Sequence, residues 1–301
     1  MSQRADTATR TKKRAEPESA FGAALVQLRR NPGAIFSVVI IVVVVISALG
    51  ADLIAPFDPN QQDLSMRLMP PGSVDAEGHH RWLGTDALGR DVLSGVIHGT
   101  RISLTVALSA VVLGLGIGLL LGVLSGYYRG WIDTIIMRAV DVTIVMPFFL
   151  MALVLRIALG PGLGSIIVAL GVSGWALYAR LVRGEVLSLR NREYVLASQA
   201  AGANGWYIMM RRITPHVIPS LLVFASLQVG VVIVAEASLT FLGLGVPPDV
   251  PSWGTMLATG RDYLVRAWWV ATFPGVAIVL TVLSLNIFGD WLRDVRDPKL
   301  G

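Results

Sequence analysis

Long apolar stretches alternate with shorter polar segments along this chain. The first stretch, from Ala34 to Ala51, consists almost entirely of Val, Ile and Ala, and five more follow it. The later stretches are Ile102 to Gly126, Ile132 to Leu159, Ser165 to Val182, Val217 to Leu242, and Trp268 to Phe288. Because a helix needs roughly 20 mostly apolar residues to cross the hydrocarbon core of a bilayer, this pattern predicts six membrane-spanning helices.

Composition supports this interpretation. Only 15% of the 301 residues are charged and 54% are hydrophobic, whereas soluble domains carry about a quarter charged residues. The chain contains no cysteine, so disulfides stabilise none of its segments. Lys and Arg lie between the apolar stretches rather than in one basic patch, which favours a role in membrane orientation over nucleic-acid binding.

The distribution of Lys and Arg predicts the orientation, because cytoplasmic segments carry the excess. The terminal segments and the segment 183–216 are rich in Arg or Lys, whereas the segment 53–100 carries many acidic residues. Both termini are therefore predicted to be cytoplasmic. The first stretch follows about thirty polar residues and exceeds a usual signal-peptide core in length, so we expect it to remain uncleaved. The expected layout is a disordered cytoplasmic tail (1–32), a first transmembrane helix (33–52), an extracytoplasmic loop (53–100), a five-helix core (101–291) containing the loop 183–216, and a cytoplasmic tail (292–301).

The second span carries a stripe of small residues that recurs every four positions. Its members are Ala110, Gly114, Gly118, Gly122 and Gly126. Such a stripe lets the backbone of another helix approach closely, which is how helices associate in lipid. We therefore interpret these glycines as packing positions and not as part of a phosphate-binding loop.

Ionisable residues inside spans are costly and invite a functional interpretation. Arg138 and Asp141 are three residues apart and could neutralise each other on one helical face. Arg156 lies near the outer end of the third span, where its long side chain could reach water. Glu236 has no partner nearby in the sequence, so Glu236 and Asp141 are the candidates for a role in the transport path or its gating. Pro147 should kink the third span, because it removes a backbone hydrogen bond.

The polar segment from Arg183 to Pro219 is too polar to span a membrane and long for a simple connection. Its pattern predicts a helix near 190–201, a turn at Gly202, and a second amphipathic piece, 206–213, that ends at Pro215. Two short helices joined by a glycine turn could form a docking surface for a cytoplasmic partner. They could equally form a hairpin that lies on the lipid surface, and the pattern alone leaves both interpretations open.

This segment resembles the EAA loop of bacterial ABC importer permeases, whose pattern is Glu-Ala-Ala, three residues, Gly, then a spacer to Ile and Leu-Pro. The corresponding residues here are Leu196-Ala197-Ser198, then Gly202, then Ile213-Thr214-Pro215. The first alanine, the glycine, the isoleucine and the proline match. Leu196 replaces the motif glutamate, and Glu193 lies about one helical turn earlier.

The resemblance extends over roughly residues 82–298. LGTDALGRDVLSGVIHGTRISL, YARLVRGEVLSL, EASLTFLGLGV, PSWGTML and FGDWLRDVRDPKL are all similar to segments of the dipeptide, oligopeptide and nickel permeases, in the same order. The match is to the second of the two permease types in such systems. It implies an all-α, six-helix membrane protein with the type I ABC importer permease fold, located in the bacterial cytoplasmic membrane.

The resemblance also implies a mechanism and a set of partners. The chain is expected to be a non-catalytic subunit that moves di- or oligopeptides by alternating access, beside a second permease, two ATP-binding subunits or domains, and an extracytoplasmic solute-binding protein. ATP and Mg would be bound by the partner ATPase, and no cofactor or metal by this chain. The residues expected to contact the ATPase are Glu193, Ala197, Ala200, Gly202, Ile213 and Pro215. The residues expected at the docking face for the binding protein are Pro251, Ser252 and Trp253, although a turn capped by an interfacial Trp is an alternative.

Two other classes of protein are weighed against this one. A secondary transporter driven by an ion gradient usually shows internal repeats with paired broken helices, and we find no convincing repeat between the halves of the sequence. An intramembrane enzyme would need converging catalytic groups, and no HExxH, GxSxG or CxxC motif occurs. The substrate stays open, because permeases of this family also serve nickel, glutathione and other small solutes.

Overall fold

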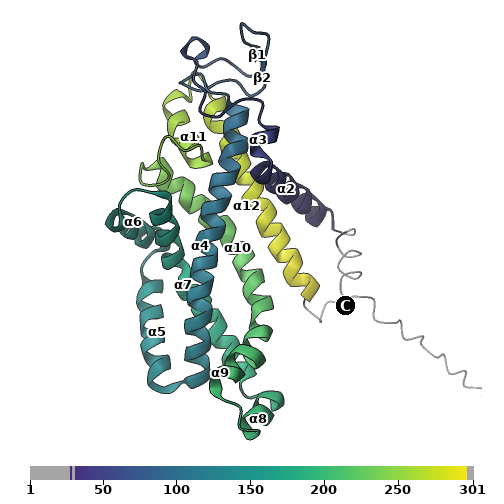
Figure 1. Cartoon of the computed structure of the whole chain (residues 1–301), viewed down its shortest axis with the longest axis vertical. Helices are drawn as coiled ribbons and strands as arrows, with labels where there is room; N and C mark the ends of the chain where they lie inside the picture. Colours follow the sequence, from purple (N-terminus) through teal and green to yellow (C-terminus); the bar gives the residue numbers. More distant parts are fainter. Residues whose placement is uncertain (1–27, 29–30, 297–301) are drawn as a thin grey trace, which may run out of the picture.

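The protein is an elongated bundle of helices in a computed structural model that describes residue 28 and residues 31–296 (Figure 1). The predicted disordered tail, 1–32, lies almost entirely outside these residues, as does the end of the predicted tail 292–301. The long helices are α2 (Pro32–Leu49), α4 (Val92–Tyr128), α5 (Gly130–Val145), α6 (Phe148–Leu159), α7 (Leu163–Leu189), α10 (Thr214–Phe241) and α12 (Trp269–Arg296). The short elements are α3 (Ala51–Ile54), α8 (Glu193–Ala200), α9 (Gly205–Tyr207), α11 (Trp253–Gly260), a π-helical turn (Ile208–Ile213), 3-10 turns (Leu64–Met66 and Arg261–Tyr263), and an antiparallel hairpin of β1 (Ser73–Val74) and β2 (His80–Arg81).

Among the described helices, five are each long and apolar enough to cross a membrane, and the bent pair α5–α6 gives a sixth if it counts as one span. The axes of α5 and α6 differ by 97° across the break at Met146 and Pro147. Proline lacks the amide hydrogen that would continue the helical hydrogen bonds, so the predicted kink is confirmed. The third predicted span, 132–159, is therefore broken into two helices at this kink.

Helix α4 is longer than the sequence pattern predicts. It begins at Val92 rather than near Ile102, because the Asp91 carboxylate accepts a hydrogen bond from the Ser94 amide at 2.8 Å and caps the first turn. Its 37 residues reach about 55 Å at about 1.5 Å per residue, whereas the hydrocarbon core is roughly 30 Å thick. Its length therefore exceeds the thickness of the hydrocarbon core, and its first turns lie at the end of the molecule that carries the hairpin (Figure 1). The last helix is also longer than expected, because α12 continues to Arg296.

The small-residue stripe of α4 packs directly against α7, as predicted. A Cβ atom at Gly114 would lie 2.7 Å from the carbonyl oxygen of Gly171, and one at Gly122 would lie 2.7 Å from that of Ala179. Since real Cβ atoms do not approach this closely, only glycine permits the observed separation of the two helices. Close backbone approach along the stripe joins this pair, and the side chains of Tyr178 and Val182 of α7 pack against the stripe glycines.

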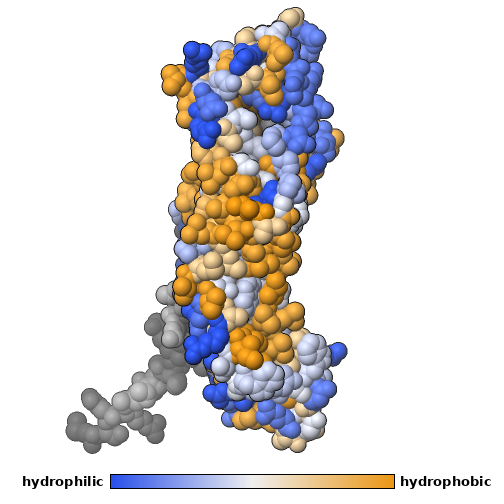
Figure 2. Space-filling view, turned by 90° about the vertical axis from the view of Figure 1, so that its left-hand side faces the viewer, coloured by the Kyte–Doolittle hydropathy of each residue, from blue (hydrophilic) through white to orange (hydrophobic). Residues whose placement is uncertain are grey.

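The outer surface of the bundle carries the band expected of a membrane protein. Figure 2 shows a broad hydrophobic zone between two more hydrophilic ends. Large apolar side chains such as Val39, Val142 and Val279 are each more than half exposed. A patch of this size is unfavourable in water, so lipid or other membrane helices must cover it.

Hydrogen bonds hold the segment between α2 and α4, residues 50–91, against the bundle. Arg101 of α4 donates to the carbonyl of Ala48 at 2.9 Å and to the Asp52 carboxylate at 3.0 Å. The hydrogen bond from Arg101 to the Asp52 carboxylate is the main reason that the pKa of Asp52 is lowered. In the hairpin, the backbone amide of His79 donates to Asp75 at 2.8 Å and is the main reason that the pKa of Asp75 is lowered. The indole of Trp269 donates to the carbonyl of Thr85 at 3.1 Å, which ties the segment to α12.

Candidate functional site

The segment that resembles the EAA loop forms a helix–turn–helix at the end of the molecule opposite the hairpin (Figure 1). Helix α8 ends at Ala200, and Gly202 follows with a φ of +77°, a left-handed conformation that favours glycine. The amide of Gly202 donates to the carbonyl of Gln199 at 2.9 Å, and the Asn204 side chain caps α9 by accepting from the Tyr207 amide. The predicted pair of short helices and the glycine turn are confirmed.

The end of this segment differs from the prediction. The second helical piece does not stop at Pro215, because α9 passes through the π-helical turn Ile208–Ile213 directly into α10. Pro215 lies in the first turn of α10, directly after this π-helical turn. Helix α9, the π-helical turn and α10 are thus one continuous helical element, with no loop between α9 and α10.

The residues expected to contact an ATPase fall into two groups by exposure. Glu193, Ala197, Ala200, Gly202 and Pro215 are exposed on this end of the molecule, whereas Ile213 is fully buried. The opposite face of α8 packs inward through Val195, which joins the same core as Ile208, Met209 and Ile213. Ile213 therefore anchors the segment and cannot present its side chain to another subunit. The contact role of the exposed residues stays a prediction.

Two carboxylate–arginine pairs connect α5 to α7, and the sequence analysis assigned neither. Asp141 pairs with Arg180 at 2.6 Å, so the expected neutralisation by Arg138 on the same helix is wrong. Asp133 accepts two hydrogen bonds from Arg183, at 2.6 and 2.7 Å, and a third from the Ser125 hydroxyl. Such bidentate pairs fix geometry as well as charge. The partners lie 39 and 50 residues apart in sequence, so only the packing of α5 on α7 could have revealed them.

Glu236 lies at the centre of a buried polar network. Its side chain is fully buried, and it accepts hydrogen bonds from Ser103 of α4 at 3.1 Å and from Thr240 of α10 at 2.9 Å. Thr240 is one turn away, so the expectation of no sequence-local partner is wrong. The two hydroxyls in turn accept from the amides of Trp253 and Val246 at 3.4 and 3.1 Å. The Glu236 side chain therefore connects α4 and α10 to the segment 246–253, which follows α10.

The residues predicted to meet a binding protein are mostly inside the molecule. Ser252 is fully buried and caps α11 through a reciprocal pair of hydrogen bonds with Thr255, and Trp253 is only 1% exposed. The Trp253 indole donates to the carbonyl of Val96 at 3.0 Å. Pro251 is partly exposed. The alternative of an interfacial Trp does not fit this burial, and a docking role for the three residues stays a prediction.

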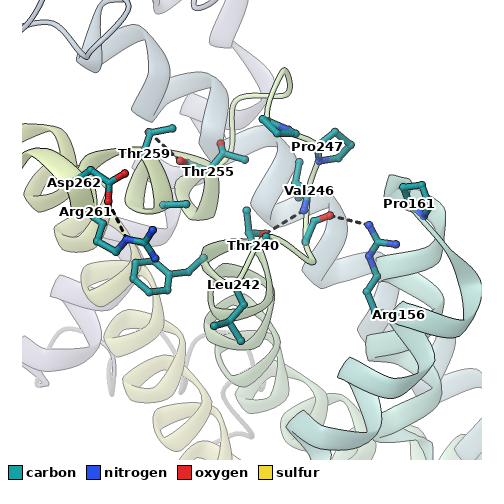
Figure 3. Close-up of a pocket in the computed structure, with 15 residues that line it drawn as sticks. Arg156, Pro161, Thr240, Leu242, Val246, Pro247, Thr255, Thr259, Arg261 and Asp262 are labelled. Carbon is teal, nitrogen blue, oxygen red and sulfur yellow. Dashed lines mark hydrogen bonds and ion pairs between the residues drawn. The ribbon is translucent and has the colours of Figure 1, made fainter.

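A cavity of about 640 Å³ lies beside this network, between the ends of α6 and α10 and the helix α11 (Figure 3). Arg156 of α6 lines it and is only 6% exposed. The guanidinium of Arg156 donates to the carbonyl of Gly245 at 3.0 Å, to the Ser165 hydroxyl at 3.1 Å and to the carbonyl of Gly160. The expectation that Arg156 reaches water is therefore wrong. Pockets of this size and mixed lining are typical of small-molecule sites.

The described residues contain no group of three or more His, Asp or Glu side chains that could hold a metal ion. The ionisable residues inside the bundle instead pair with one another or with hydroxyl and carbonyl groups. The described residues thus contain two regions with functional character at opposite ends of the bundle, the helix–turn–helix α8–α9 and the cavity with the Glu236 network beside it.

Comparison with known families matches two profiles to this chain. Residues 118–301 match the binding-protein-dependent transport system inner membrane component, and residues 19–71 match the N-terminal TM domain of oligopeptide transport permease C. The first of these profiles covers more than half of the chain.

Individual proteins are similar over nearly the whole length. The chain is 43% identical to the di/tripeptide transport system permease protein DppC of Pseudomonas aeruginosa, over 90% of this chain and 89% of that protein. It is 46% identical to the dipeptide transport system permease protein DppC of Escherichia coli K12, over 90% and 91% of the two chains. It is 43% identical to the glutathione transport system permease protein GsiD of Pectobacterium atrosepticum, over 73% of each.

Among solved structures, the fold resembles a chain of the MetNI methionine ABC transporter in an inward-facing conformation. The TM-score is 0.54 at 22% sequence identity, and the match covers 67% of this chain and 96% of the other. At this identity the likeness concerns the fold alone.

Proposed function

Because the chain belongs to the family of binding-protein-dependent transport system inner membrane components, we propose that it carries di- or oligopeptides across the bacterial cytoplasmic membrane within an ATP-driven importer. The chain is a permease subunit of an ABC transporter and not itself an ATPase. Relatives named for dipeptide and di/tripeptide transport, similar over about nine tenths of the chain, support the choice of substrate.

A permease of this kind works with a partner permease, an ATPase and a binding protein. In the proposed assembly the partner permease is a different chain, so that the transport path lies in a heterodimer, and two ATP-binding subunits or domains bind ATP and Mg. Both termini lie in the cytoplasm, on the side of α8 and α9. The excess of Lys and Arg in the terminal and α8–α9 segments supports this orientation.

The helix–turn–helix α8–α9 transmits the motion of the ATPases in this proposal. The observation that carries it is the division of the segment into an exposed face and a buried one: Glu193 and Ala197 are exposed, whereas Val195 and Ile213 are fully buried. Since α9 continues without interruption into α10, a push on the exposed face moves the span that holds Glu236. Asp141, which is paired with Arg180, is the second residue proposed to respond to this motion.

Substitution of Gly202 provides the test. Because its backbone is left-handed and its surroundings within this chain are open, a substitution changes the backbone conformation without creating a steric clash inside the chain. A Cβ atom at Gly202 would meet no atom within 4 Å, so substitution acts through the φ of +77° alone. Asn tolerates this conformation better than β-branched residues do. We expect Gly202→Val to lose peptide-stimulated ATP hydrolysis in the assembled importer by roughly tenfold or more, at a conformational cost of about 1–2 kcal/mol or higher, and Gly202→Asn to keep most of it.

The measurement is co-purification of the tagged chain with its ATPase, followed by ATP hydrolysis and peptide uptake in proteoliposomes. Equal loss in both variants would contradict a role for the turn conformation. If the parent chain purified alone and moved solute under an ion gradient without ATP, the importer proposal itself would be wrong.

A further inference from the structure

We propose that the cavity beside Arg156 is a substrate site that binds the C-terminal carboxylate of the transported peptide. This inference rests on the proposed peptide transport and deepens it by naming a site for one end of the substrate. It is carried by a buried cation that has no carboxylate partner among the described residues and that lines a cavity of ligand size.

The position of Arg156 is unusual because its charge is buried but not neutralised. Its partners are two backbone carbonyls and one hydroxyl, all of them uncharged. Its Nε atom is buried and has no hydrogen-bond partner. Arg183 of α7 differs, since it is paired with the Asp133 carboxylate. Buried cations are normally paired, so a guanidinium charge that no carboxylate of the described residues neutralises points to an anionic ligand.

The rest of the cavity fits one end of a peptide. Thr240, Thr255 and Thr259 make part of the lining polar, with their hydroxyls hydrogen-bonded within the protein, and Val246 and Pro247 supply apolar surface. A volume of about 640 Å³ lies within the range of small-molecule sites. Carboxylate is the anion that every peptide with a free C-terminus carries, and arginine binds it through charge-assisted hydrogen bonds.

Charge around the cavity also favours an anion. Figure 3 shows Arg156 and Arg261 on opposite sides of it. The guanidinium of Arg261 lies 5.2 Å from the ring centroid of Phe241, another lining residue, and donates to Asp262 at 3.2 Å. The lining residues thus carry two guanidinium groups and one carboxylate. The carboxylate lies beside Arg261, which leaves the positive charge of Arg156 for the ligand.

The site lies where binding could be coupled to motion. Gly245, whose carbonyl accepts from Arg156, directly precedes Val246, whose amide donates to Thr240 in the Glu236 network. A ligand that draws the guanidinium toward the cavity would therefore act on the loop that this network holds. The position of the cavity at the outer end of α10 suits a substrate that enters from outside.

The test compares transport of a dipeptide with transport of its C-terminal amide by the complete importer in proteoliposomes. The binding protein is saturated with each peptide, and its own preference cancels when the acid-to-amide ratio of a variant is divided by that of the parent. We expect Arg156→Gln to lower this ratio roughly tenfold, because one charge-assisted hydrogen bond to the carboxylate is lost. Arg261→Gln should lower it by about threefold through the weaker electrostatic attraction, and Arg156→Lys should restore part of it.

The control variant is Arg266→Gln, which removes an exposed outer arginine that does not line the cavity and should leave the ratio unchanged. An unchanged ratio in Arg156→Gln would overturn the proposed site, as would an equal fall in Arg266→Gln. If Arg156→Gln does not assemble, the ratio of Arg261→Gln decides. Failure of the parent importer to transport the peptide would instead overturn the proposed function. This outcome is distinct because it is measured without any substitution at the site.

Discussion

Acidic residues that a membrane span would normally exclude are stabilised here by hydrogen bonds, most of them from other helices. Glu236 receives hydrogen bonds from Ser103 and Thr240, and Asp133 receives a bidentate pair from Arg183. A buried polar group costs free energy unless its hydrogen bonds are satisfied. These partners explain how the carboxylates can lie inside an apolar bundle, and they make each side chain a link between elements.

Substitution of Glu236 separates the hydrogen-bonding role of this side chain from its size. Glu236→Ala leaves the Ser103 and Thr240 hydroxyls without their acceptor and creates a cavity, which we expect to lower the free energy of unfolding by about 2–4 kcal/mol. Glu236→Gln keeps the volume and one acceptor, and should cost about half as much. Thermal unfolding of the detergent-solubilised importer measures both, and equal losses would argue against the hydrogen-bond network as the stabilising feature.

At the scale of elements, the bundle is organised around two kinds of helix contact. The glycine stripe of α4 allows backbone contact with α7, while the pairs Asp133–Arg183 and Asp141–Arg180 connect α5 to α7. Helix α7 is therefore held from two sides. Its C-terminal end leads into α8, so the segment proposed to meet the ATPase extends directly from this packed helix.

Two glycines of α4 provide a matched test of this packing. Gly122→Ala places a Cβ atom 2.7 Å from the carbonyl oxygen of Ala179, whereas a Cβ atom at Gly116 meets nothing within 4 Å. We expect Gly122→Ala to lower the free energy of unfolding by about 1–3 kcal/mol through overpacking. Gly116→Ala should be neutral or stabilising by up to about 1 kcal/mol, because alanine favours the helix. The shift in melting temperature distinguishes them, and a similar shift for both would contradict close α4–α7 packing as the cause.

At the scale of the whole molecule, the two ends have different characters. The outer end carries the hairpin, α11 and the cavity beside Arg156, while the opposite end carries α8 and α9 (Figure 1). The hydrophobic band between them sets the position of the membrane (Figure 2). The proposed transport therefore places substrate recognition and energy coupling at opposite ends of the bundle, connected by α10.

The orientation can be tested directly because the chain contains no cysteine. Ala76→Cys places a thiol in the exposed outer hairpin, and Asn191→Cys places one on the exposed segment before α8. A membrane-impermeant maleimide applied to spheroplasts should label Ala76→Cys at once and Asn191→Cys only after permeabilisation. The reverse pattern would show that the positive-inside interpretation of the sequence is wrong.

The sequence predicted the number of apolar spans, the kink at Pro147, the glycine stripe and the turn at Gly202, because each depends on local pattern. It placed span ends incorrectly where a cap or a continuous helix extends them, as at Asp91 and Pro215. It also missed the partners of Asp141 and the burial of Arg156. The missed partners of Asp141 and Arg156 include Arg180 and Gly245, which are distant in sequence, whereas the misplaced span ends depend on the local contacts at Asp91 and on the helix that continues through Pro215.

The amino-acid sequence by itself determined that the chain is a helical membrane protein of the ABC importer permease type, because apolar length, charge asymmetry and motif order are properties of the chain read in one dimension. Only the tertiary structure decided which charges meet, that Ile213, Ser252 and Trp253 are buried, and that Arg156 lines a cavity. Those features arise when helices distant in sequence pack together in a medium where every polar group needs a partner.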